Sequence, residues 1–378
     1  MTLPDRVDVA VVGAGPAGCA AAITLCAFTS LRVALIDRAP PNRKPGEMLQ
    51  PGAGELLAYL GLSAETVGAV HRPSHAMSAA WGSDQLTEWP LIFAMGQPAL
   101  HVDRQGLETA LRERASACGA TLQLHAVRST RKHDDGWALT FDSDEQPAQS
   151  ARFLIDASGP GARFARAAGA RVHTTHRSVA IWSTARAALG EDIADAGGVL
   201  VETAPEGWWY SAAVPGNGLV AALFTDAAIL TGGALNSPDR WHEALARTRH
   251  TRQRLSNAGG WTSPITRPAH VQHLAPAHGA DWVACGDAAM TVDPLSAMGM
   301  SLGLTTGIHA GRLAAAYCAG TDVTDCGYSD EIARQHDMHV AMLDRCFAQE
   351  RHWPDAPFWA ARQAQRPATK VHAVAAVA

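Results

Sequence analysis

The sequence has no paired cysteines. Seven cysteines are scattered among its 378 residues, and none belongs to a Cys-x-x-Cys pair. An odd number of unclustered cysteines favours reduced thiols over a disulfide framework. The fold must therefore depend on an ordinary hydrophobic core, which a chain of this length with 47% hydrophobic residues can supply.

Long apolar runs are also absent. No apolar run without charges or breakers reaches the roughly 18 residues that a membrane-spanning helix needs, except the Ala/Gly-rich segment after Asp293, which a buried helix explains better. The six residues before the first apolar strand leave no room for a signal peptide. We therefore expect a soluble, cytoplasmic protein that contacts no membrane.

The excess of negative charge is small, with a formal net charge of −5, and this argues against a nucleic-acid partner. Residues 247–254 are dense in arginine; we interpret them as a solvated helix face, and a basic patch for an acidic partner is the alternative. The spacings His173/His176 and His336/His339 could place two metal ligands on one helix face, but no third ligand stands nearby. We predict solvated histidines and no metal.

What the sequence does contain is one dinucleotide-binding fingerprint near its start. Residues 13–18 read Gly-Ala-Gly-Pro-Ala-Gly, between an apolar run and an Ala-rich run, and this strand–turn–helix context is the one the motif needs. Gly13 allows the turn, Gly15 lets a pyrophosphate approach, and Gly18 lets helix and strand pack closely. A second apolar run ends in Asp37, about 20 residues further on, where an acidic residue binds a ribose hydroxyl. An aspartate there favours FAD or NAD over NADP.

A second motif, far downstream, separates FAD from NAD. Residues 281–289 form a short apolar strand that ends in Gly286-Asp287, and residues 293–300 then read Asp-Pro-Leu-Ser-Ala-Met-Gly-Met before a long helical run. An aspartate at a strand end can hold polyol hydroxyls. A glycine-rich helix start can lie close to a flat ring or a phosphate.

With these residues the chain resembles the FAD-dependent monooxygenase and halogenase superfamily, which has the para-hydroxybenzoate-hydroxylase-like fold. Residues 44–49 are similar to the family's loop near the flavin, residues 102–104 to its flavin-contacting arginine, and residues 154–159 to a further strand end. The resemblance implies FAD as the cofactor. The fingerprint and the resemblance together give these cofactor-binding residues: Gly13, Gly15, Pro16, Ala17, Gly18, Asp37, Arg38, Lys44, Glu47, Arg104, Gly286, Asp287, Pro294, Met298, Gly299 and Met300.

The expected fold class is α/β: a Rossmann-like FAD-binding domain with an intergrown antiparallel-sheet substrate domain. We assign residues 1–70, 100–171 and 276–330 to a discontinuous FAD-binding domain. The substrate-binding domain takes residues 71–99 and 172–275, and residues 331–378 form a C-terminal helical tail. Helices are predicted over 54–60, 104–117, 238–258 and 329–362.

Three absences narrow the chemistry. A second dinucleotide fingerprint is missing, which disfavours reductases with two dinucleotide-binding domains. Residues 156–159 read Asp-Ala-Ser-Gly, whereas many single-component hydroxylases have Gly-Ala-Asp-Gly there, around NADPH. Direct reduction by NAD(P)H is therefore in doubt, and a separate flavin reductase becomes a candidate partner. The halogenase signature Trp-x-Trp-x-Ile-Pro is incomplete before Pro215, and residues 74–82 contain no lysine to hold a hypohalous species.

The remaining details resemble a narrower, halogenase-related group, the flavoproteins that mature tryptophylquinone enzymes (LodB-, GoxB- and QhpG-type proteins). Residues 81–83, 207–211, 293–296, 350–353 and 358–359 carry this resemblance. It implies hydroxylation of an aromatic, tryptophan-like substrate, which in that group is a tryptophan of a partner polypeptide. The predicted substrate-pocket residues are Trp81, Trp208, Trp209 and Tyr210, and a Trp-rich strand that only packs is the alternative.

The catalytic residues stay unknown at this point. Glu47 is a candidate for handling a proton near the flavin, and a loop salt bridge with Lys44 or Arg43 is its alternative. Three rival functions stay open: halogenation or hydroxylation of a small aromatic natural product, FAD-dependent reduction of a double bond, and a non-catalytic flavoprotein chaperone. For the chaperone, exposed aromatic residues in the tail (Trp353, Phe358 and Trp359) would dock a partner, unless they pack back on the core.

Overall fold

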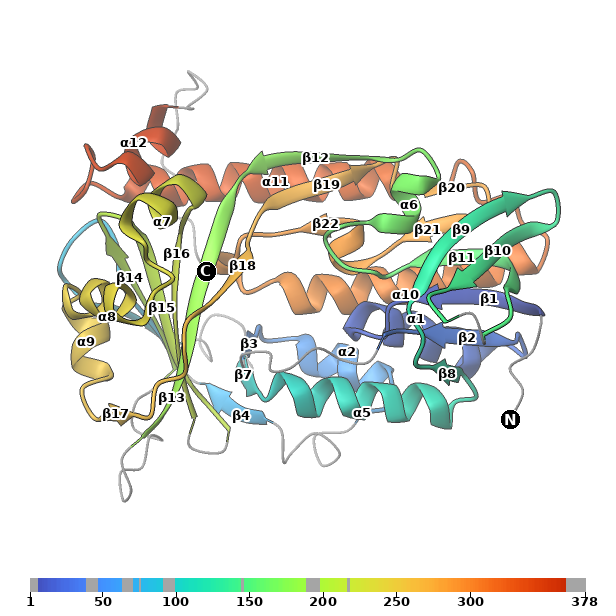
Figure 1. Cartoon of the computed structure of the whole chain (residues 1–378), viewed down its shortest axis with the longest axis horizontal. Helices are drawn as coiled ribbons and strands as arrows, with labels where there is room; N and C mark the ends of the chain where they lie inside the picture. Colours follow the sequence, from blue (N-terminus) through green and yellow to red (C-terminus); the bar gives the residue numbers. More distant parts are fainter. Residues whose placement is uncertain are drawn as a thin grey trace.

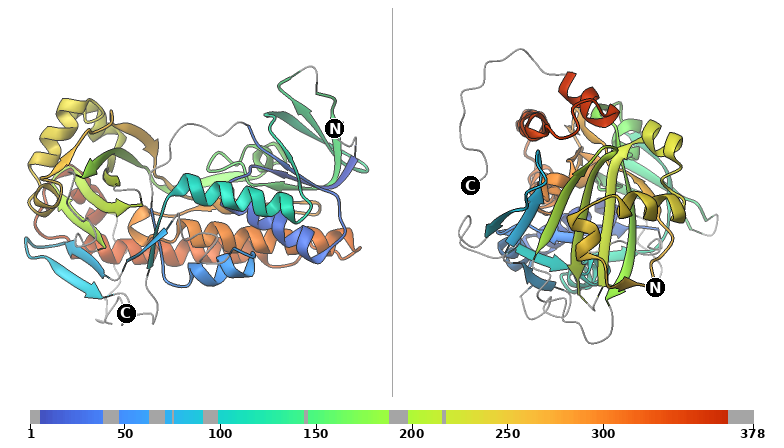
Figure 2. Two further views of the ribbon diagram at one scale, coloured as in Figure 1. Left: turned by 90° about the horizontal axis from the view of Figure 1, so that it is seen from below. Right: turned by 90° about the vertical axis from the view of Figure 1, so that its left-hand side faces the viewer.

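Two large sheets lie at opposite ends of the chain's folded structure (Figure 1). The structure is a computed structural model that describes residues 6–38, 47–62, 71–74, 76–90, 99–143, 146–187, 198–215 and 218–364. Within these residues the chain forms two eight-stranded sheets and two three-stranded sheets. The second large sheet stands at one end of the long axis and the β9–β10 hairpin of the first at the other (Figure 2).

The first large sheet is Rossmann-like, as predicted. Strands β8, β2, β1, β11 and β21 are neighbours in that order and run parallel, while β20 and the β9–β10 hairpin pair antiparallel with them. The central strands are nearly continuous Val, Ala, Leu and Ile, which is typical of parallel strands buried on both faces. Their bounds are β1 Arg6–Val12, β2 Val33–Ile36, β8 Thr121–Gln123, β9 Val127–His133, β10 Gly136–Phe141, β11 Gln149–Asp156, β20 His278–Gly279 and β21 Trp282–Ala284.

Helices α1 (Pro16–Phe28), α5 (Arg104–Ala117) and α10 (Gly299–Cys318) pack together beside this sheet, with α2 (Ala53–Tyr59) against α10 and α6 (Arg163–Ala167) near β11 (Figure 1). The approach of α1 to α10 depends on small residues. A Cβ at Gly307 would lie 2.2 Å from the carbonyl oxygen of Ala17, and one at Gly311 would lie 2.8 Å from that of Ala21. The helices that follow the two sequence motifs are therefore in direct backbone contact.

The second large sheet has the order β17-β13-β16-β15-β14-β5-β6, and β18 pairs with β13. Its pairs are antiparallel, as predicted, except that β14 and β5 are parallel. Only a direct hairpin forces neighbours to be antiparallel, and strands β8 to β11 of the first sheet lie between β5 and β14 in the sequence. The bounds are β5 Ala76–Ala80, β6 Thr87–Pro90, β13 Ser178–Ala187, β14 Val199–Ala204, β15 Gly207–Val214, β16 Gly218–Asp226, β17 Ala258–Gly259 and β18 Ile265–Pro268.

Two small sheets lie between the large ones. One has the order β3-β7-β4 and the other β12-β19-β22, and all their pairs are antiparallel. In Figure 1, β12 and β19 run lengthwise from one half of the molecule to the other. The bounds are β3 Glu47–Leu49, β4 His71–Ser74, β7 Ala99–Val102, β12 Arg171–His176, β19 Val271–Ala275 and β22 Met290–Thr291.

The predicted helix over 238–258 is two helices, α8 (Pro238–Ala246) and α9 (His250–Arg254), with α7 (Ala227–Gly233) before them. The single-helix prediction is wrong because a buried carboxylate restarts the helix. Glu202 on β14 accepts hydrogen bonds from the backbone N–H groups of Arg249, His250 and Thr251 at 2.6, 3.2 and 2.7 Å. These are N–H groups at a helix start, which need an acceptor outside the helix.

The predicted helix over 329–362 is also two helices, α11 (Tyr328–Gln349) and α12 (Pro357–Ala364). Glu350 interrupts it, because its carboxylate accepts from the backbone N–H groups of Gly82, His352 and Trp353. Gly82 has little room there, since a Cβ would lie 2.5 Å from the carbonyl oxygen of Gln349. The end of α11 is thus bound to the segment after β5.

The C-terminal helices cover one face of the second sheet, which we call the inner face. Phe358 and Trp359 are 1% and 0% exposed, and the Trp359 indole donates to the carbonyl oxygen of Ala204 at 2.8 Å. Arg362 binds the Asp226 carboxylate through two bonds of 2.9 and 2.7 Å. An exposed docking surface is therefore wrong for Phe358 and Trp359, because large aromatic rings bury apolar area against a sheet that needs a cover.

The prediction of solvated histidines is wrong for three of the four singled out. His176, His336 and His339 are buried between β12, β19 and α11, and the rings of His273 and His336 are 4.3 Å apart. Across the described part of the chain, no three His, Cys, Asp or Glu side chains are grouped so that they could hold a metal ion. Among the same residues, no helix combines the length and the apolar character that crossing a membrane requires.

Candidate functional site

The glycine turn lies between β1 and α1, at the carboxyl end of the parallel strands. A Cβ at Gly13, whose φ is +114°, would lie 2.1 Å from the carbonyl oxygen of Ala157, and one at Gly18 would lie 1.8 Å from that of Gly13. A Cβ at Gly15 would meet no described atom within 4 Å. Gly13 and Gly18 are therefore required by packing, and Gly15 borders open space. A pyrophosphate fits there, against the N-terminus of α1, where Pro16 is the first helical residue.

The two sequence motifs meet at this edge of the sheet. Val12 is in register with Ile36 and with Asp156, and Asp156 is in register with Ala284, so four neighbouring strands end together. Open α/β sheets bind their ligands at this edge. Gly286 packs against the start of α1, because a Cβ there would lie 2.6 Å from the Cβ of Ala17. Asp287 follows on a short 3₁₀ helix, η2 (Gly286–Ala288), with an exposed side chain.

Asp37 marks a cavity of about 460 Å³ beside the turn. Its Oδ2 accepts the backbone N–H of Ala14 at 2.9 Å. The walls include Arg38 and Arg112 and the apolar side chains of Leu122 and Leu124. A carboxylate for ribose hydroxyls beside apolar walls for a base would suit the adenosine end of a dinucleotide, and the ribose-binding role of Asp37 stays a prediction.

Asp156 has a different role from that of Asp37, although it also ends a strand. Its buried carboxylate accepts from the backbone N–H groups of Ser158, Phe164 and Ala165 at 3.0, 2.9 and 2.7 Å. It therefore holds the turn between β11 and α6, and this turn begins with Ala157, whose carbonyl oxygen Gly13 approaches. The motif at residues 154–159 therefore supports the glycine turn by packing against it and does not need to contact the ligand.

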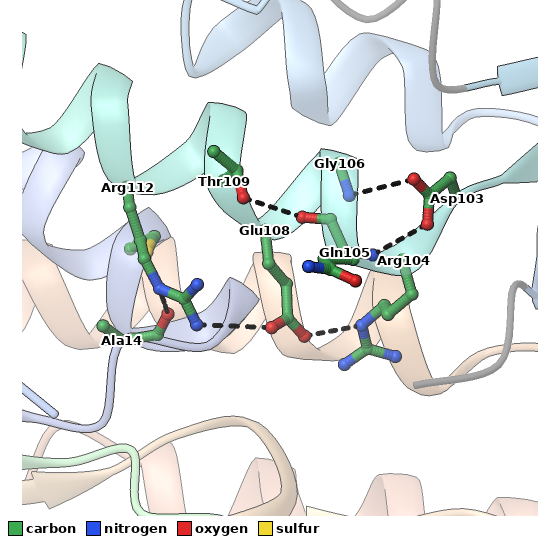
Figure 3. Close-up of polar contacts among 9 residues, drawn as sticks. Ala14, Asp103, Arg104, Gln105, Gly106, Glu108, Thr109 and Arg112 are labelled. Carbon is green, nitrogen blue, oxygen red and sulfur yellow. Dashed lines mark hydrogen bonds and ion pairs between the residues drawn. The ribbon is translucent and has the colours of Figure 1, made fainter. Parts of the chain in front are cut away.

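Helix α5 carries a row of charged residues toward the glycine turn (Figure 3). Asp103 caps the helix, and its carboxylate accepts from the backbone N–H groups of Gln105 and Gly106. The predicted Arg104 donates from Nε to Oε1 of Glu108 at 2.8 Å, and Arg112 donates from Nη2 to Oε2 at 3.3 Å. Glu108 and Arg112 were not predicted. The spacing of four between residues 104, 108 and 112 could have identified them, because it places them on one helix face.

The segment Asp293–Gly299 forms a compact loop that leads into α10, whose first residue is Gly299. Asp293 accepts from the backbone N–H of Leu295 at 2.9 Å and so caps η3, a 3₁₀ helix (Pro294–Ser296). The amide of Gln50, which was not predicted, donates to the carbonyl oxygen of Ser296 at 2.5 Å. Met298, within this loop, is 43% exposed, while Met300 in α10 is buried. The loop thus joins the segment after β3 to the start of α10, and its predicted place beside the flavin stays a prediction.

A buried acid and a buried histidine meet behind this loop. Burial raises the pKa of the Asp293 carboxyl to about 6, although the Leu295 hydrogen bond and the Arg362 charge oppose the change. The backbone N–H of Asp293 donates to Nε2 of His339 at 2.8 Å. Burial, with smaller contributions from His336 and His176, lowers the pKa of His339 to about 4. His339 is therefore a neutral acceptor near pH 7.

Two predicted residues cannot be placed in the site. Lys44 lies outside the described residues, as does the side chain of Glu47, whose backbone pairs with Val102 in β3–β7. The proposed proton-handling role of Glu47 stays a prediction.

The predicted aromatic residues divide between two faces of the second sheet. Trp208 and Tyr210 belong to the inner-face cluster, whereas Trp209 is fully buried on the opposite face against Trp241, at 5.3 Å between ring centroids. Trp81 joins the inner cluster, 6.5 Å from Trp208, and its indole donates to the carbonyl oxygen of Cys346. The structure brings three of the four residues together and separates Trp209, because side chains alternate along a strand.

Comparison with known proteins agrees with this geometry. The family described as FAD binding domain matches residues 6–326. The FAD-dependent oxidoreductase LodB of Marinomonas mediterranea is 26% identical over 95% of this chain and 98% of its own length, and a menaquinone reductase of Mycobacterium tuberculosis is 29% identical over 83% of this chain and 78% of its own. Among solved structures, the peptidyl tryptophan dihydroxylase QhpG superposes with a TM-score of 0.76 at 23% identity, covering 97% of this chain and 81% of QhpG. The flavin-dependent halogenase CmlS superposes with a TM-score of 0.84 at 24% identity, covering 96% of this chain and 68% of CmlS.

Proposed function

Because this chain belongs to the FAD binding domain family, and is an FAD-dependent oxidoreductase, we propose that it is a monooxygenase that hydroxylates a tryptophan-like aromatic group. The proposed substrate is a tryptophan side chain in a partner polypeptide. Support for this choice comes from the full-length match to LodB and from the likeness to QhpG, whose name states that it is a peptidyl tryptophan dihydroxylase essential for tryptophylquinone cofactor biogenesis.

One observation carries the proposal. The inner-face aromatic residues and the Asp293–Gly299 loop contribute to the same apolar cluster, in which Trp81, Trp208 and Tyr210 are joined by Leu295 and Ala297. Leu295 and Ala297 belong to the loop predicted to flank the flavin. An aromatic substrate that packed against the exposed edge of this cluster would therefore lie next to the reacting part of the cofactor.

The residues of this chain bind, orient and exclude water. The glycine turn, the N-terminus of α1 and the Asp37 cavity suit the nucleotide end of FAD. Reduced FAD supplies two electrons for O2, so that one oxygen atom enters the substrate and the other leaves as water. Helices α11 and α12 cover part of the apolar inner face, and this cover limits access of water to that reaction. The proposal needs no catalytic base on the chain, and it includes a separate flavin reductase as the electron donor.

Halogenation is the second candidate function, and the superposition on CmlS favours it. The sequence counts against it, since residues 74–82 contain no lysine. Reduction of a double bond is the third candidate, in view of the menaquinone reductase match.

The reaction can be tested with FAD-loaded protein reduced by light, so that the result does not depend on the electron donor. The reduced protein is mixed with oxygenated buffer, sodium bromide and a tryptophan-containing peptide, and the peptide is analysed by mass spectrometry. We expect the peptide to gain one or two oxygen atoms. Replacement of hydrogen by bromine, or no change in the peptide, would contradict hydroxylation of peptidyl tryptophan; an oxygen gain confined to free tryptophan analogues would move the substrate to small molecules.

A matched pair of variants locates the site. Tyr210→Leu removes a ring from the inner face, and we expect about tenfold less product, the order of one aromatic contact. Trp241→Phe removes a similar amount of packing from the opposite face and should lower stability without changing product formation. Equal product from both variants would exclude the inner face as the substrate site.

A further inference from the structure

We propose that Glu108 is a positioning residue for FAD, which orients Arg104 toward the cofactor and, through Arg112, fixes the turn that receives the pyrophosphate. The inference depends on FAD as the cofactor and is independent of the reaction proposed above. Glu108 is 3% exposed. A carboxylate buried to this extent needs charged or hydrogen-bonding partners, and α5 supplies two arginines for it.

The three side chains leave α5 on the same side, one turn apart (Figure 3). Glu108 stands between the arginines and gives one carboxylate oxygen to each: Oε1 to Nε of Arg104 at 2.8 Å and Oε2 to Nη2 of Arg112 at 3.3 Å. A bond to Nε fixes the plane of a guanidinium group, because the group is planar and its donors form a rigid fork. Two arginines against one glutamate leave this helix face with a net positive charge, which suits an anionic ligand.

The contacts continue into the glycine turn. Arg112 donates from Nε to the carbonyl oxygen of Ala14 at 3.0 Å, and the thiol of Cys19 donates to the same oxygen at 3.4 Å. The N–H of Ala14 donates in turn to Asp37. Both peptide groups of Ala14 are therefore fixed: its N–H by Asp37, the predicted ribose-binding residue, and its carbonyl oxygen by Arg112 of α5.

These contacts form one path from the adenosine cavity to the flavin-contacting arginine: Asp37, Ala14, Arg112, Glu108 and Arg104. Both Asp37 and Arg112 line the cavity of about 460 Å³. Glu108 is the member that joins the two arginines. Without its charge, the arginines would repel each other and lose the acceptor that orients them, so the cradle would have to be ordered when FAD binds.

The test is the affinity of the apoprotein for FAD, measured by quenching of flavin fluorescence and by calorimetry. Glu108→Gln keeps the shape of the side chain and removes its charge, and we expect the FAD dissociation constant to rise at least about tenfold, the range for a lost charged hydrogen bond. Arg104→Gln should have an effect of similar size. In the double variant, Glu108→Gln should weaken FAD binding by less than it does in the wild type, because the oriented Arg104 guanidinium is already gone and only the contact through Arg112 remains to be lost.

Glu202→Gln is the matched control. It also removes the charge of a buried carboxylate, but one that caps α9 behind the second sheet. We expect a lower unfolding temperature and an unchanged FAD dissociation constant. A merely structural role for Glu108 would give the same pattern as this control, or would give additive effects in the double variant, and either result would overturn the proposal.

If Glu108→Gln does not fold, Arg104→Lys tests the same bond from the other side. Lysine keeps the positive charge but cannot present a planar group fixed at Nε. The proposal requires about tenfold weaker FAD binding with the unfolding temperature of the apoprotein preserved. Wild-type affinity in this variant would also overturn it.

Discussion

The glycine turn and the inner face of the second sheet are built in opposite ways. The turn is made of backbone: Gly13 and Gly18 are required because carbonyl oxygens occupy the space of a side chain, and neighbouring strand ends supply the rest. The inner face is made of side chains from β5, β15, the loop before α10, α11 and α12, which are far apart in the sequence. A site made of backbone requires a short motif of glycines that can be recognised in the sequence. A site made of distant side chains requires apolar residues in several separate segments, and no single motif identifies it.

The largest expected effect separates the glycines within the turn. Gly13→Ala places a Cβ 2.1 Å from the carbonyl oxygen of Ala157 at a φ of +114°, so we expect a loss of stability above about 4 kcal/mol and little folded protein. Gly15→Ala meets no described atom within 4 Å and has an allowed backbone conformation, with φ −77°. It should fold as stably as the wild type and bind FAD more weakly. Thermal unfolding of the apoprotein and FAD titration measure the two effects.

This pair of variants tests whether Gly13 is required for packing while Gly15 is required for FAD binding. Equal loss of stability in both variants would mean that Gly15 is also a packing residue. Unchanged FAD binding in Gly15→Ala would mean that the pyrophosphate lies elsewhere.

The same contrast explains what the sequence could predict. Gly13, Asp37 and Gly286 each follow an apolar strand in the sequence, and the structure brings them to one sheet edge because neighbouring strand ends of a parallel sheet meet. Glu108 escaped prediction because a glutamate on a helix is normally solvated, whereas this one is 3% exposed on a helix that packs against α1. The contacts of Glu202 and Glu350 with distant backbone broke two predicted helices in the same way. Long-range burial of charge has no local signature.

Arg362→Leu should damage the inner face without touching the glycine turn. Arg362 is buried, forms two bonds with Asp226 and stands 3.5 Å over the ring of Phe358. The Asp226 carboxylate that remains is 27% exposed, so water partly compensates for its lost partner, and we expect a cost of about 3 kcal/mol, the lower limit for a fully buried pair. We expect the urea midpoint to fall by a corresponding amount, while protein that remains folded binds FAD with wild-type affinity.

The double variant Arg362→Leu/Asp226→Leu serves as the control. It removes both charges, so it should recover part of the lost stability. A failure to recover any would show that the packing of Arg362 on Phe358, and not the ion pair, attaches α12 to the sheet.

The smallest expected effect lies where the two regions join, at Asp293 and His339. The folded pKa of His339, about 4, is below its unfolded value, so below pH 6.5 the unfolded state binds more protons and the contribution of His339 to stability rises from pH 4 to 6.5. The folded pKa of Asp293, about 6, is above its unfolded value of 3.8, so its contribution falls between pH 3.8 and 6. In the wild type the two contributions oppose each other over nearly the same range.

Single substitutions should therefore reveal pH dependences of opposite sign. His339→Gln leaves Asp293 unopposed, and relative to the wild type it should be more stable at pH 4.5 than at pH 7 by about 2 kcal/mol. Asp293→Asn leaves His339 unopposed and should show the reverse. His176 and His273, whose pKa values burial also lowers, stay in both variants and cancel in the differences. Urea unfolding between pH 4.5 and 7 measures them. If stability changed with pH in the same way in all three proteins, Asp293 and His339 would have the same pKa values in the folded and unfolded chain. The proposed buried acid and base at this junction would then be wrong.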